Sequence, residues 1–352
     1  MVIPSFGSNA MLAKSRAMYG KGLTDRNYAD LLACHTVSEV AAYLKTKTHY
    51  ASCLTSITPQ SVHREQLEVL LKRYLFAQYA ILSRYEISIG QDFYSYFVVK
   101  SELEMVLSQL HKINAQEHII AGDAEPGFIK KFSRLEESEI ASANNLLQLA
   151  QVLKGTEYGE ILHSFVEKMD FDLQRDGTLE IEAALMNYEY SVMEKLARKH
   201  LRGKNLQEVL EILQRQSDFL AITNIYRMKR MLGASSEYIR CRISMEHTLL
   251  SDKKIMQLLQ TDDQEEFLRV LKTTRYGKEL SNVAYEYIED GIQKVQYHFH
   301  LKKFRFSTNP SAVMLCYFFL TEIELTNVIH IVEGIRYGMS SEEIERLLVG
   351  IH

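Results

Sequence analysis

The chain has 352 residues, of which 46% are hydrophobic and 24% charged, a balance typical of soluble globular proteins with room for two or three cores. The formal net charge of −4 argues against nucleic acid as the main partner. Only 4 Pro and 16 Gly occur, and so few helix breakers predict an all-α fold with long helices.

Cysteine usage and apolar runs indicate the compartment. The 4 cysteines are scattered without C-x-x-C spacing, which favours a reducing cytoplasm over a disulfide framework or a zinc site. The opening MVIPSFGSNAML lacks the charged and apolar regions of a signal peptide. The longest apolar run, AVMLCYFFL at 312–320, is about half a membrane span. We therefore expect no transmembrane segment.

The first predicted elements lie in VAAYLKTKTHYASCL at 40–54. Leu44 shares a helical face with the residues three and four positions before it. A lysine and a threonine-containing spacer follow, and Tyr50 has a leucine four residues later. The phrase predicts two short helices joined by a tight corner, with the tyrosine ring closing the corner.

Two long helices are predicted after this corner. The first, at 64–82, is amphipathic and rich in tyrosine. The second, at 96–110, begins near Phe97 and places leucine and valine at the 0, 3, 4, 7 spacing of a buried helix face. A polar loop at 115–127 comes after them.

The same order of elements recurs twice more along the chain. The corner phrase returns as LAQVLKGTEYGEIL at 149–162 and as FLRVLKTTRYGKEL at 267–280. A long amphipathic helix and a helix that begins near a phenylalanine come next each time. The recurring anchors are Leu153, Tyr158 and Phe219 in the second copy and Leu271, Tyr276 and Phe319 in the third, with helices predicted at 180–201, 218–232, 282–301 and 318–332.

These recurrences predict three tandem helical domains at 1–115, 116–235 and 236–352, with a second loop at 233–237. A period above a hundred residues is too long for a solenoid, so we interpret it as triplication of a small helical domain. Aligning the three phenylalanines places Glu102, Asn224 and Glu324 in one column. A chance likeness of amphipathic helices is disfavoured, because polar and aromatic positions recur in the same order.

No pattern in the sequence assembles an active site. Phosphate-loop and zinc-protease motifs are absent. His298 and His300 are two residues apart, which on a helix points them in different directions and excludes a shared metal ion. A catalytic cysteine is disfavoured, because the neighbouring histidines are adjacent only in sequence. We therefore predict no catalytic residues and no cofactor.

The three recurring lysines, Lys45, Lys154 and Lys272, have two interpretations. They could contact a symmetric partner at three equivalent points. Alternatively, each places a positive charge at the C-terminal end of a helix, where it meets free carbonyl groups and the helix dipole. The second interpretation is favoured.

The stretch YHFHLKKFRF at 297–306 interleaves aromatic and basic residues. Such residues could stack on nucleic acid. A helix, however, would bury the aromatic face and leave His298, Lys302 and Arg305 outside. We favour a basic docking face for an acidic protein partner or a membrane-proximal surface, and we predict Lys302, Lys303 and Arg305 as its residues.

Three segments carry a resemblance to a known family. They are LAKSRAMYGKGLTDRNYADLL, VSEVAAYLKTKTHY and the closing YFFLTEIELTNVIHIVEGIRYGMSSEEIERLL. The chain resembles, over its whole length, the C subunit of the prokaryotic V-type (A-type) ATPases, which is equivalent to the d subunit of the eukaryotic enzyme. The middle copy departs most from the pattern, with Asn224 in place of a glutamate.

The resemblance implies a non-enzymatic rotor subunit. It implies a funnel of three pseudo-threefold-related helical domains that couples the central shaft subunits D and F to the membrane rotor ring. The work would be ATP-driven transport of protons or sodium ions, or ATP synthesis. The protein would be peripheral, on the cytoplasmic face of the membrane.

Two other functions remain open from the sequence. One is a soluble all-helical adaptor or scaffold with no tie to a membrane complex. The other is an enzyme with a site at the domain junctions, where pockets often lie. The driven ion and the direction of catalysis are not encoded in these features.

Overall fold

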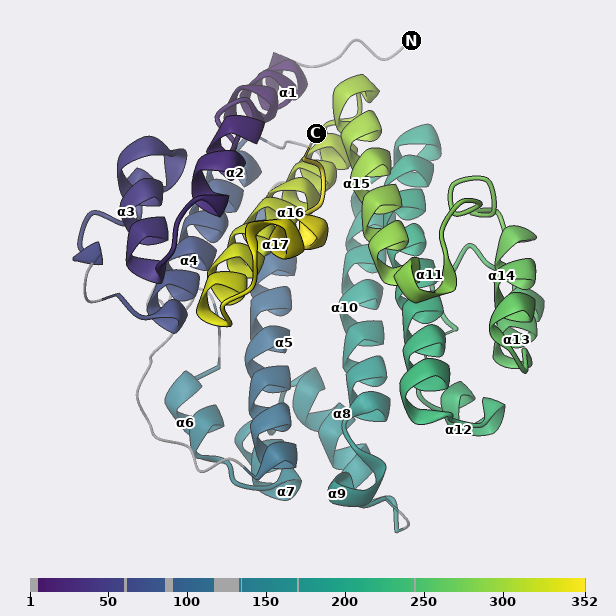
Figure 1. The fold of residues 1–352 in the computed structure, drawn as a ribbon. Helices are drawn as coiled ribbons and strands as arrows, with labels where there is room; N and C mark the ends of the chain where they lie inside the picture. Colours follow the sequence, from purple (N-terminus) through teal and green to yellow (C-terminus); the bar gives the residue numbers. More distant parts are fainter. Residues whose placement is uncertain are drawn as a thin grey trace. The chain divides into compact units, whose positions relative to one another are not determined.

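The computed structural model describes residues 6–59, 62–85, 91–116, 133, 135–169, 171–243 and 245–351. Over these ranges the chain forms helices joined by turns and loops without a β-strand, so the predicted all-α class is confirmed (Figure 1). The helices fall into two compact units. Unit 1 comprises residues 1–94, 200–212 and 289–352, and unit 2 comprises residues 95–199 and 213–288.

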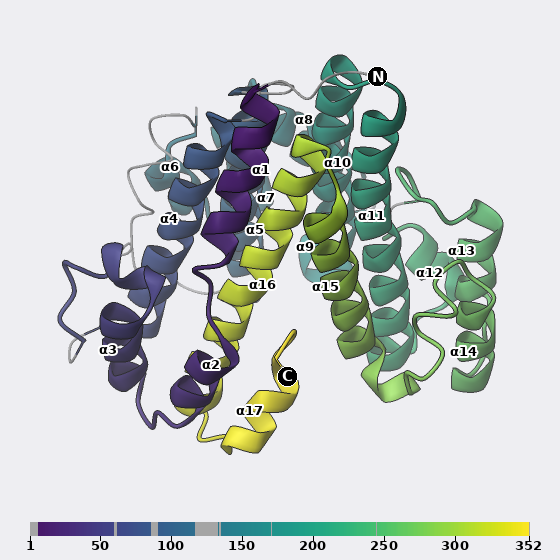
Figure 2. The same ribbon diagram turned by 90° about the horizontal axis from the view of Figure 1, so that it is seen from above.

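Unit 1 is built around α16 (Pro310–Arg336), in which residues 310–320 are all buried. This helix packs against α1, α3, α4 and α17, and Figures 1 and 2 both show it alongside α1 and α4. Tyr79 and Phe318, both buried, meet edge to face with ring centroids 4.0 Å apart. The other helices of the unit are α1 (Phe6–Tyr19), α2 (Asp25–Leu32), α3 (Val37–Lys47), η1 (His49–Ser52), α4 (Arg64–Ser83), α15 (Ile288–Phe306) and α17 (Ser341–Leu347).

Local sequence explains where helices of unit 1 begin. Asn309 and Pro310 separate α15 from α16, because proline suits a first helical turn whose N–H groups have no partner. Thr24 and Ser340 cap α2 and α17, and each forms both bonds of a capping box. The caps satisfy backbone donors that the first turn leaves unpaired.

Unit 2 holds the middle of the chain. Its helices form two sets of neighbours, in which α7 contacts α6 and α8, and α13 contacts α12 and α14. One apolar core joins α5, α7, α8 and α10. Two helices, α5 and α10, extend slightly beyond unit 2, and α11 begins in unit 1, to which its residues 203–212 belong. The helices of unit 2 are α5 (Gln91–Ala115), α6 (Glu137–Ser142), α7 (Leu146–Val152), α8 (Glu157–Val166), α9 (Leu173–Asp176), α10 (Leu179–His200), the rest of α11 (Gly203–Leu232), α12 (Ser236–Arg240), α13 (Asp252–Leu259), α14 (Gln264–Lys272) and η4 (Tyr285–Tyr287).

The three corners differ in the structure that the chain adopts after the tyrosine. Two short helices with a tight corner, as predicted, form only in the second copy, as α7 and α8. The first copy continues with the 3₁₀ turn η1, and the third continues with turns over 273–282. The second copy alone has a run of apolar residues long enough to bury another helical face, whereas its sisters soon reach serine, threonine and asparagine, which favour turns.

The predicted long helices are present, with different lengths. Those expected at 64–82 and 180–201 match α4 and α10 to within one residue. The helices expected at 96–110, 218–232 and 318–332 are parts of the longer α5, α11 and α16. The helix expected at 282–301 begins only at Ile288, because Tyr285 is instead buried in a cluster with the rings of Tyr226 and Phe267.

The loops between copies are only partly described. The loop expected at 115–127 lies, from residue 117 onward, outside the described residues. The break expected at 233–237 is present but shorter, over 233–235, because α12 already begins at Ser236. It begins at Gly233, whose φ of 55° ends α11 in the left-handed conformation that suits glycine. The domain boundaries 1–115, 116–235 and 236–352, and the pseudo-threefold funnel, remain predictions.

Candidate functional site

Each corner tyrosine is buried and donates its hydroxyl to a carboxylate on a long helix. The same carboxylate also accepts a hydrogen bond from a loop that precedes the corner in the chain. This loop leads into α2 in the first copy, α6 in the second and α13 in the third. We call each such group a latch. The three latches pair Tyr50 with Glu324, Tyr158 with Glu102 and Tyr276 with Asp218.

The first latch lies in unit 1. Tyr50 Oη donates to Glu324 Oε1 at 2.9 Å, and the backbone N–H of Leu23 donates to Oε2 at 2.7 Å. His49 Nε2 lies 3.1 Å from Oε1, with both side chains largely buried. The carboxylate thereby joins α16, the corner and the loop that enters α2.

The second latch lies in unit 2. Tyr158 Oη lies 3.1 Å from Glu102 Oε2 and 3.1 Å from the carbonyl oxygen of Val99, both on α5. Ser133 Oγ donates to Glu102 Oε1 at 2.6 Å, and residue 133 precedes α6. The arrangement therefore repeats that of the first latch.

The third latch also lies in unit 2. Tyr276 Oη donates to Asp218 Oδ2, and the backbone N–H groups of Leu249 and Leu250 each donate to Oδ1 at 3.0 Å. These two residues precede α13. Asp218 is fully buried, so its three donors replace the water it would otherwise bind.

The third latch corrects the alignment made from sequence. That alignment matches Phe219 to Phe97 and Phe319, and it places Asn224 with the two glutamates. The latches instead place Asp218 there, so the predicted register of the middle copy is wrong by six residues. The matching triplets are Ser101-Glu102-Leu103, Ser217-Asp218-Phe219 and Ile323-Glu324-Leu325, and all three copies carry a carboxylate.

Burial keeps the latch hydroxyls protonated. Burial, followed by the negative charge of Glu324, raises the pKa of Tyr50 well above its usual value. Burial and the facing carboxylate also raise the pKa values of Tyr158 and Tyr276. Each tyrosine is therefore a hydrogen-bond donor throughout the physiological pH range.

The other anchors are core residues. Tyr50, Tyr158 and Tyr276 are 4%, 3% and 0% exposed, so the prediction that these rings close the corners has a packing basis. The remaining anchors, all buried, are Leu44, Leu153, Leu271, Phe97, Phe219 and Phe319.

The recurring lysines do not share one environment. Lys45 Nζ donates to the carbonyl oxygens of Thr55 and Ile57, at 3.1 and 2.7 Å. Lys154 and Lys272 are exposed. Lys45 therefore binds carbonyl groups of the segment that follows η1, and neither interpretation of the three lysines is tested by these contacts.

The three predicted interface residues separate into two groups on α15. Lys302 and Arg305 are exposed, and the buried face of the helix carries Leu301 and Phe304, as expected. Lys303 turns the other way and forms an ion pair with Glu211 at 2.8 Å. Although burial opposes its charge, the glutamates of α11 raise the pKa of Lys303.

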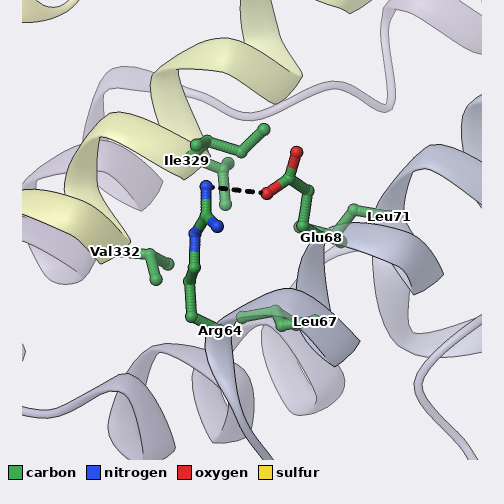
Figure 3. A pocket seen from close by; sticks show the side chains of 7 residues that line it. Arg64, Leu67, Glu68, Leu71, Ile329 and Val332 are labelled. Atoms are coloured by element: carbon green, nitrogen blue, oxygen red, sulfur yellow. Dashed lines mark ion pairs between the residues drawn. The ribbon is translucent and has the colours of Figure 1, made fainter. Parts of the chain in front are cut away.

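A small apolar seam lies between α4 and α16 in unit 1 (Figure 3). Arg64 and Glu68 form an ion pair of 3.0 Å at its rim, and Arg64 also pairs with Glu333. The floor is formed by Leu67, Leu71, Val328, Ile329 and Val332. Arg64 lies between two carboxylates at the rim and the floor is apolar, so the seam is a packing contact between the two helices.

A broader open groove lies in unit 2, between the end of α5, the start of α7 and the segment from α8 to α9. Gln174 bridges its walls, because it donates to the carbonyl oxygen of Ile113 at 3.3 Å and accepts from Gln116 at 3.1 Å. Lys112 and Asp172 bring one charge of each sign. This mixed lining selects no particular chemistry of ligand.

Cys53 and the two histidines of α15 differ in burial and direction. Burial raises the pKa of Cys53 to about 11, so it is a thiol and a poor nucleophile at neutral pH. His298 is exposed whereas His300 is 1% exposed, so they face apart as predicted. Among the described residues, no group of three His, Cys, Asp or Glu side chains is placed to hold a metal ion.

One described helix, α16, is long and apolar enough to span a membrane by length and composition alone. Of its most apolar window, 67% is buried inside the structure. That burial is typical of a core helix, and it matches the position of α16 within unit 1.

Comparison with known proteins gives one family. The model of the ATP synthase (C/AC39) subunit family matches residues 11–347. Similar curated proteins include the C subunit of the A-type ATP synthase of Pyrococcus horikoshii, 26% identical over 81% of this chain and 72% of that protein. Those of Desulfurococcus sp. and Pyrococcus abyssi are each 23% identical, over 95% and 96% of this chain and 88% of either relative.

Proposed function

Because the chain belongs to the ATP synthase (C/AC39) subunit family, we propose that it is the non-catalytic rotor subunit that joins the central shaft to the membrane rotor ring. Its partners in this role are the shaft subunits D and F and the ring subunits. The protein passes torque between ATP turnover and the transport of protons or sodium ions, in either direction. It needs no cofactor and sits peripherally on the cytoplasmic face.

The observation that carries the proposal is the family match over residues 11–347, supported by the relatives' shared name. The latches agree with a mechanical role. A part that transmits torque must resist deformation, and close-packed helices joined by buried hydrogen bonds are stiff. Each latch holds a corner against a long helix, so a load on one element passes to the other.

The burial of α16 supports a peripheral position for the protein. A helix whose apolar face fills its own core has little surface left for lipid. The ring therefore supplies the membrane-embedded part of the rotor in our proposal. The soluble adaptor remains the alternative, and it requires no association with a membrane complex.

Removal and restoration of the subunit test the proposal. We expect the complex purified without this chain to hydrolyse ATP without pumping ions, and the purified chain to restore pumping. An adaptor would leave pumping unchanged when removed. Failure of the chain to restore coupling to an otherwise intact complex would overturn the proposal.

A binding experiment separates the two partner surfaces. The purified chain should bind the D–F pair and, separately, the isolated ring in detergent. The Glu324→Gln variant, which weakens the first latch, should bind both partners but transport fewer ions per ATP hydrolysed. The ratio of the ATP hydrolysis rate to the ion transport rate would then be higher than in the wild type. A control substitution of an exposed tyrosine, Tyr287→Phe, should preserve coupling.

A further inference from the structure

Helix α15 presents an exposed ridge of basic side chains. Lys294, His298, Lys302 and Phe306 follow one another at four-residue steps, and Arg305 lies beside the last two. All five are exposed, Phe306 by 78%. Four-residue steps place side chains on one face at intervals of about 6 Å, so the ridge is about 18 Å long. We call these five residues the basic stripe.

The basic side chains of the stripe have few acidic neighbours on their own helix. Residues 291–306 contain no aspartate or glutamate, and the acidic residues of α15, Glu289 and Asp290, lie in its first turn, where Asp290 is one four-residue step before Lys294. In the part of the chain that the structure describes, no ion pair engages Lys294, Lys302 or Arg305. Arg16 of α1 donates to the carbonyl oxygens of Arg305 and Ser307, at 3.3 and 3.2 Å, and adds a further positive charge at the same end.

We propose that the basic stripe binds an acidic α-helix of a partner protein, with carboxylates at every fourth residue. Such a helix repeats its carboxylates at the same interval of about 6 Å, so that when the helices lie side by side they meet in turn Lys294, the ring N–H of His298 and Lys302. The proposed function requires surfaces that bind partners. The proposal rests on that function and deepens it by naming the chemistry of one partner.

The buried face of α15 favours a protein partner over a lipid surface. A helix that lies in a membrane interface inserts its apolar face, and on α15 that face, with Ile292, Leu301 and Phe304, fills the core of unit 1. Among the described residues of α15, Phe306 is the large apolar side chain that stays exposed. Nucleic acid is disfavoured because the chain carries a net charge of −4 and the stripe offers one exposed aromatic ring for stacking.

The position of Phe306 at one end of the stripe sets the direction in which the partner helix lies along α15. An exposed ring at one end of a charged ridge offers an apolar contact that charge alone lacks. The partner helix is therefore expected to carry an apolar residue beside its last carboxylate. The charged contacts steer association and weaken at high salt, whereas the apolar contact does not.

A pair of synthetic helices tests the proposal on the full-length chain. The first probe is a hydrocarbon-stapled helix with glutamate at every fourth position and a leucine at one end. The second has the same composition with the glutamates spread around the helix. We expect the first to bind at least about tenfold more tightly in fluorescence anisotropy at low salt, because only it aligns its charges with the stripe.

Charge reversal identifies the surface. The variant K294E/K302E/R305E should lose at least about tenfold in affinity for the first probe, because three attractive contacts become repulsive. The control K195E/K253E/K278E changes net charge equally at exposed lysines of unit 2 and should keep the affinity within about threefold. K294Q/K302Q/R305Q, which adds no negative charge near the helix end, should lose an intermediate amount.

Several results would overturn the proposal. They are equal binding of the two probes, affinity retained in K294E/K302E/R305E, or stronger stripe-dependent binding to anionic vesicles or duplex DNA than to the first probe. These measurements use no other protein of the ATPase. A failure here therefore leaves the coupling experiment as an independent test of the proposed function.

Discussion

The hydroxyl of Tyr50 donates to Glu324 across 274 positions of sequence, at 2.9 Å. The contact joins the first corner of the chain to its last long helix. In the other two latches, the carboxylate comes from the copy before the tyrosine. Each long helix therefore holds the corner of the next copy, and the last helix holds the first. Each latch thus joins elements of two different sequence repeats, because it combines the corner of one copy with the long helix of the copy before it.

Tyr50→Phe should destabilise unit 1 by about 1.5–3 kcal/mol, the range for a hydrogen bond to a charged group. Glu324→Gln should cost more, because it removes the charge and its NH₂ group would face one of the two donors, Tyr50 Oη and Leu23 N–H, while its oxygen accepts from the other. Urea denaturation measures both, and the double variant should show coupling of about 0.5–3 kcal/mol. Tyr287→Phe, at a residue 64% exposed, should change stability by less than about 0.5 kcal/mol. A comparable loss in both tyrosine variants would contradict the latch.

The sequence predicted the all-α class, the corner tyrosines and the outward face of α15, because these depend on local periodicity. It predicted Lys302 and Arg305 as exposed and missed that Lys303 turns toward Glu211. A helical residue next to an exposed one lies about 100° away, so neighbours in sequence need not share a surface. The pairing partner sits on another helix, where single-sequence patterns carry little information.

The carboxylate partners of the tyrosines could be found in sequence only with the correct register. The alignment on phenylalanines does not place Asp218 with the two glutamates. An alignment on the triplets Ser-Glu-Leu at 101–103 and Ser-Asp-Phe at 217–219 does. A long helix repeats apolar residues every three or four positions, so several registers satisfy the same apolar pattern. A buried carboxylate fixes the register, because it must meet a donor. No local signal indicates that the donor belongs to the next copy.

The residue after the corner tyrosine should tolerate a methyl group in only one copy. An added Cβ at Gly277 would lie 1.9 Å from the carbonyl oxygen of Lys272, and one at Gly159 would lie 2.2 Å from that of Leu153. The first copy has Ala51 here, after a spacer longer by one residue. Gly277→Ala and Gly159→Ala should each lower stability by at least about 2 kcal/mol, because backbone must move.

Thermal unfolding measures these two glycine variants. The matched change in the first copy, Ala51→Gly, removes a methyl group without creating a clash. It should cost only about 0.5–1 kcal/mol from added backbone entropy. Equal effects of Gly277→Ala and Ala51→Gly would contradict the steric explanation.

His111 and Glu182 should make stability depend on pH in a defined window. The bond to Glu182 raises the pKa of His111 above 6.5. Burial opposes ionisation of Glu182, but bonds from His111 and Thr178 lower its pKa below 4.5. The stabilisation from His111 is complete below 6.5 and is lost as pH rises through its raised pKa. That from Glu182 is complete above 4.5 and is lost as pH falls through its lowered pKa.

His111→Gln should therefore differ most from the wild type between pH 4.5 and 6.5. Differential scanning calorimetry should show a larger difference in Tm at about pH 5.5 than at about pH 9, where His111 is neutral. His163→Gln, at an exposed histidine beside Glu167, serves as the control and should show a smaller dependence. A Tm difference for His111→Gln that is constant across this range would contradict the assignment.

Asn327 holds the C-terminal segment to α16. It is 2% exposed, its Nδ2 donates to the carbonyl oxygen of Val349 at 2.8 Å, and its Oδ1 accepts from the Val349 N–H at 3.0 Å. It also contacts Tyr28 Oη at 3.3 Å.

Asn327→Leu should leave both backbone groups of Val349 without these partners, at a cost of about 1–3 kcal/mol for each group that stays buried. Because the end of a chain can move into water, we expect local release instead of global unfolding. Hydrogen exchange should accelerate over 345–351 and stay unchanged in α4, whereas Thr326→Ala, at an exposed neighbour, should leave both unchanged. Protection of Val349 in the Asn327→Leu variant would show that other contacts hold the segment.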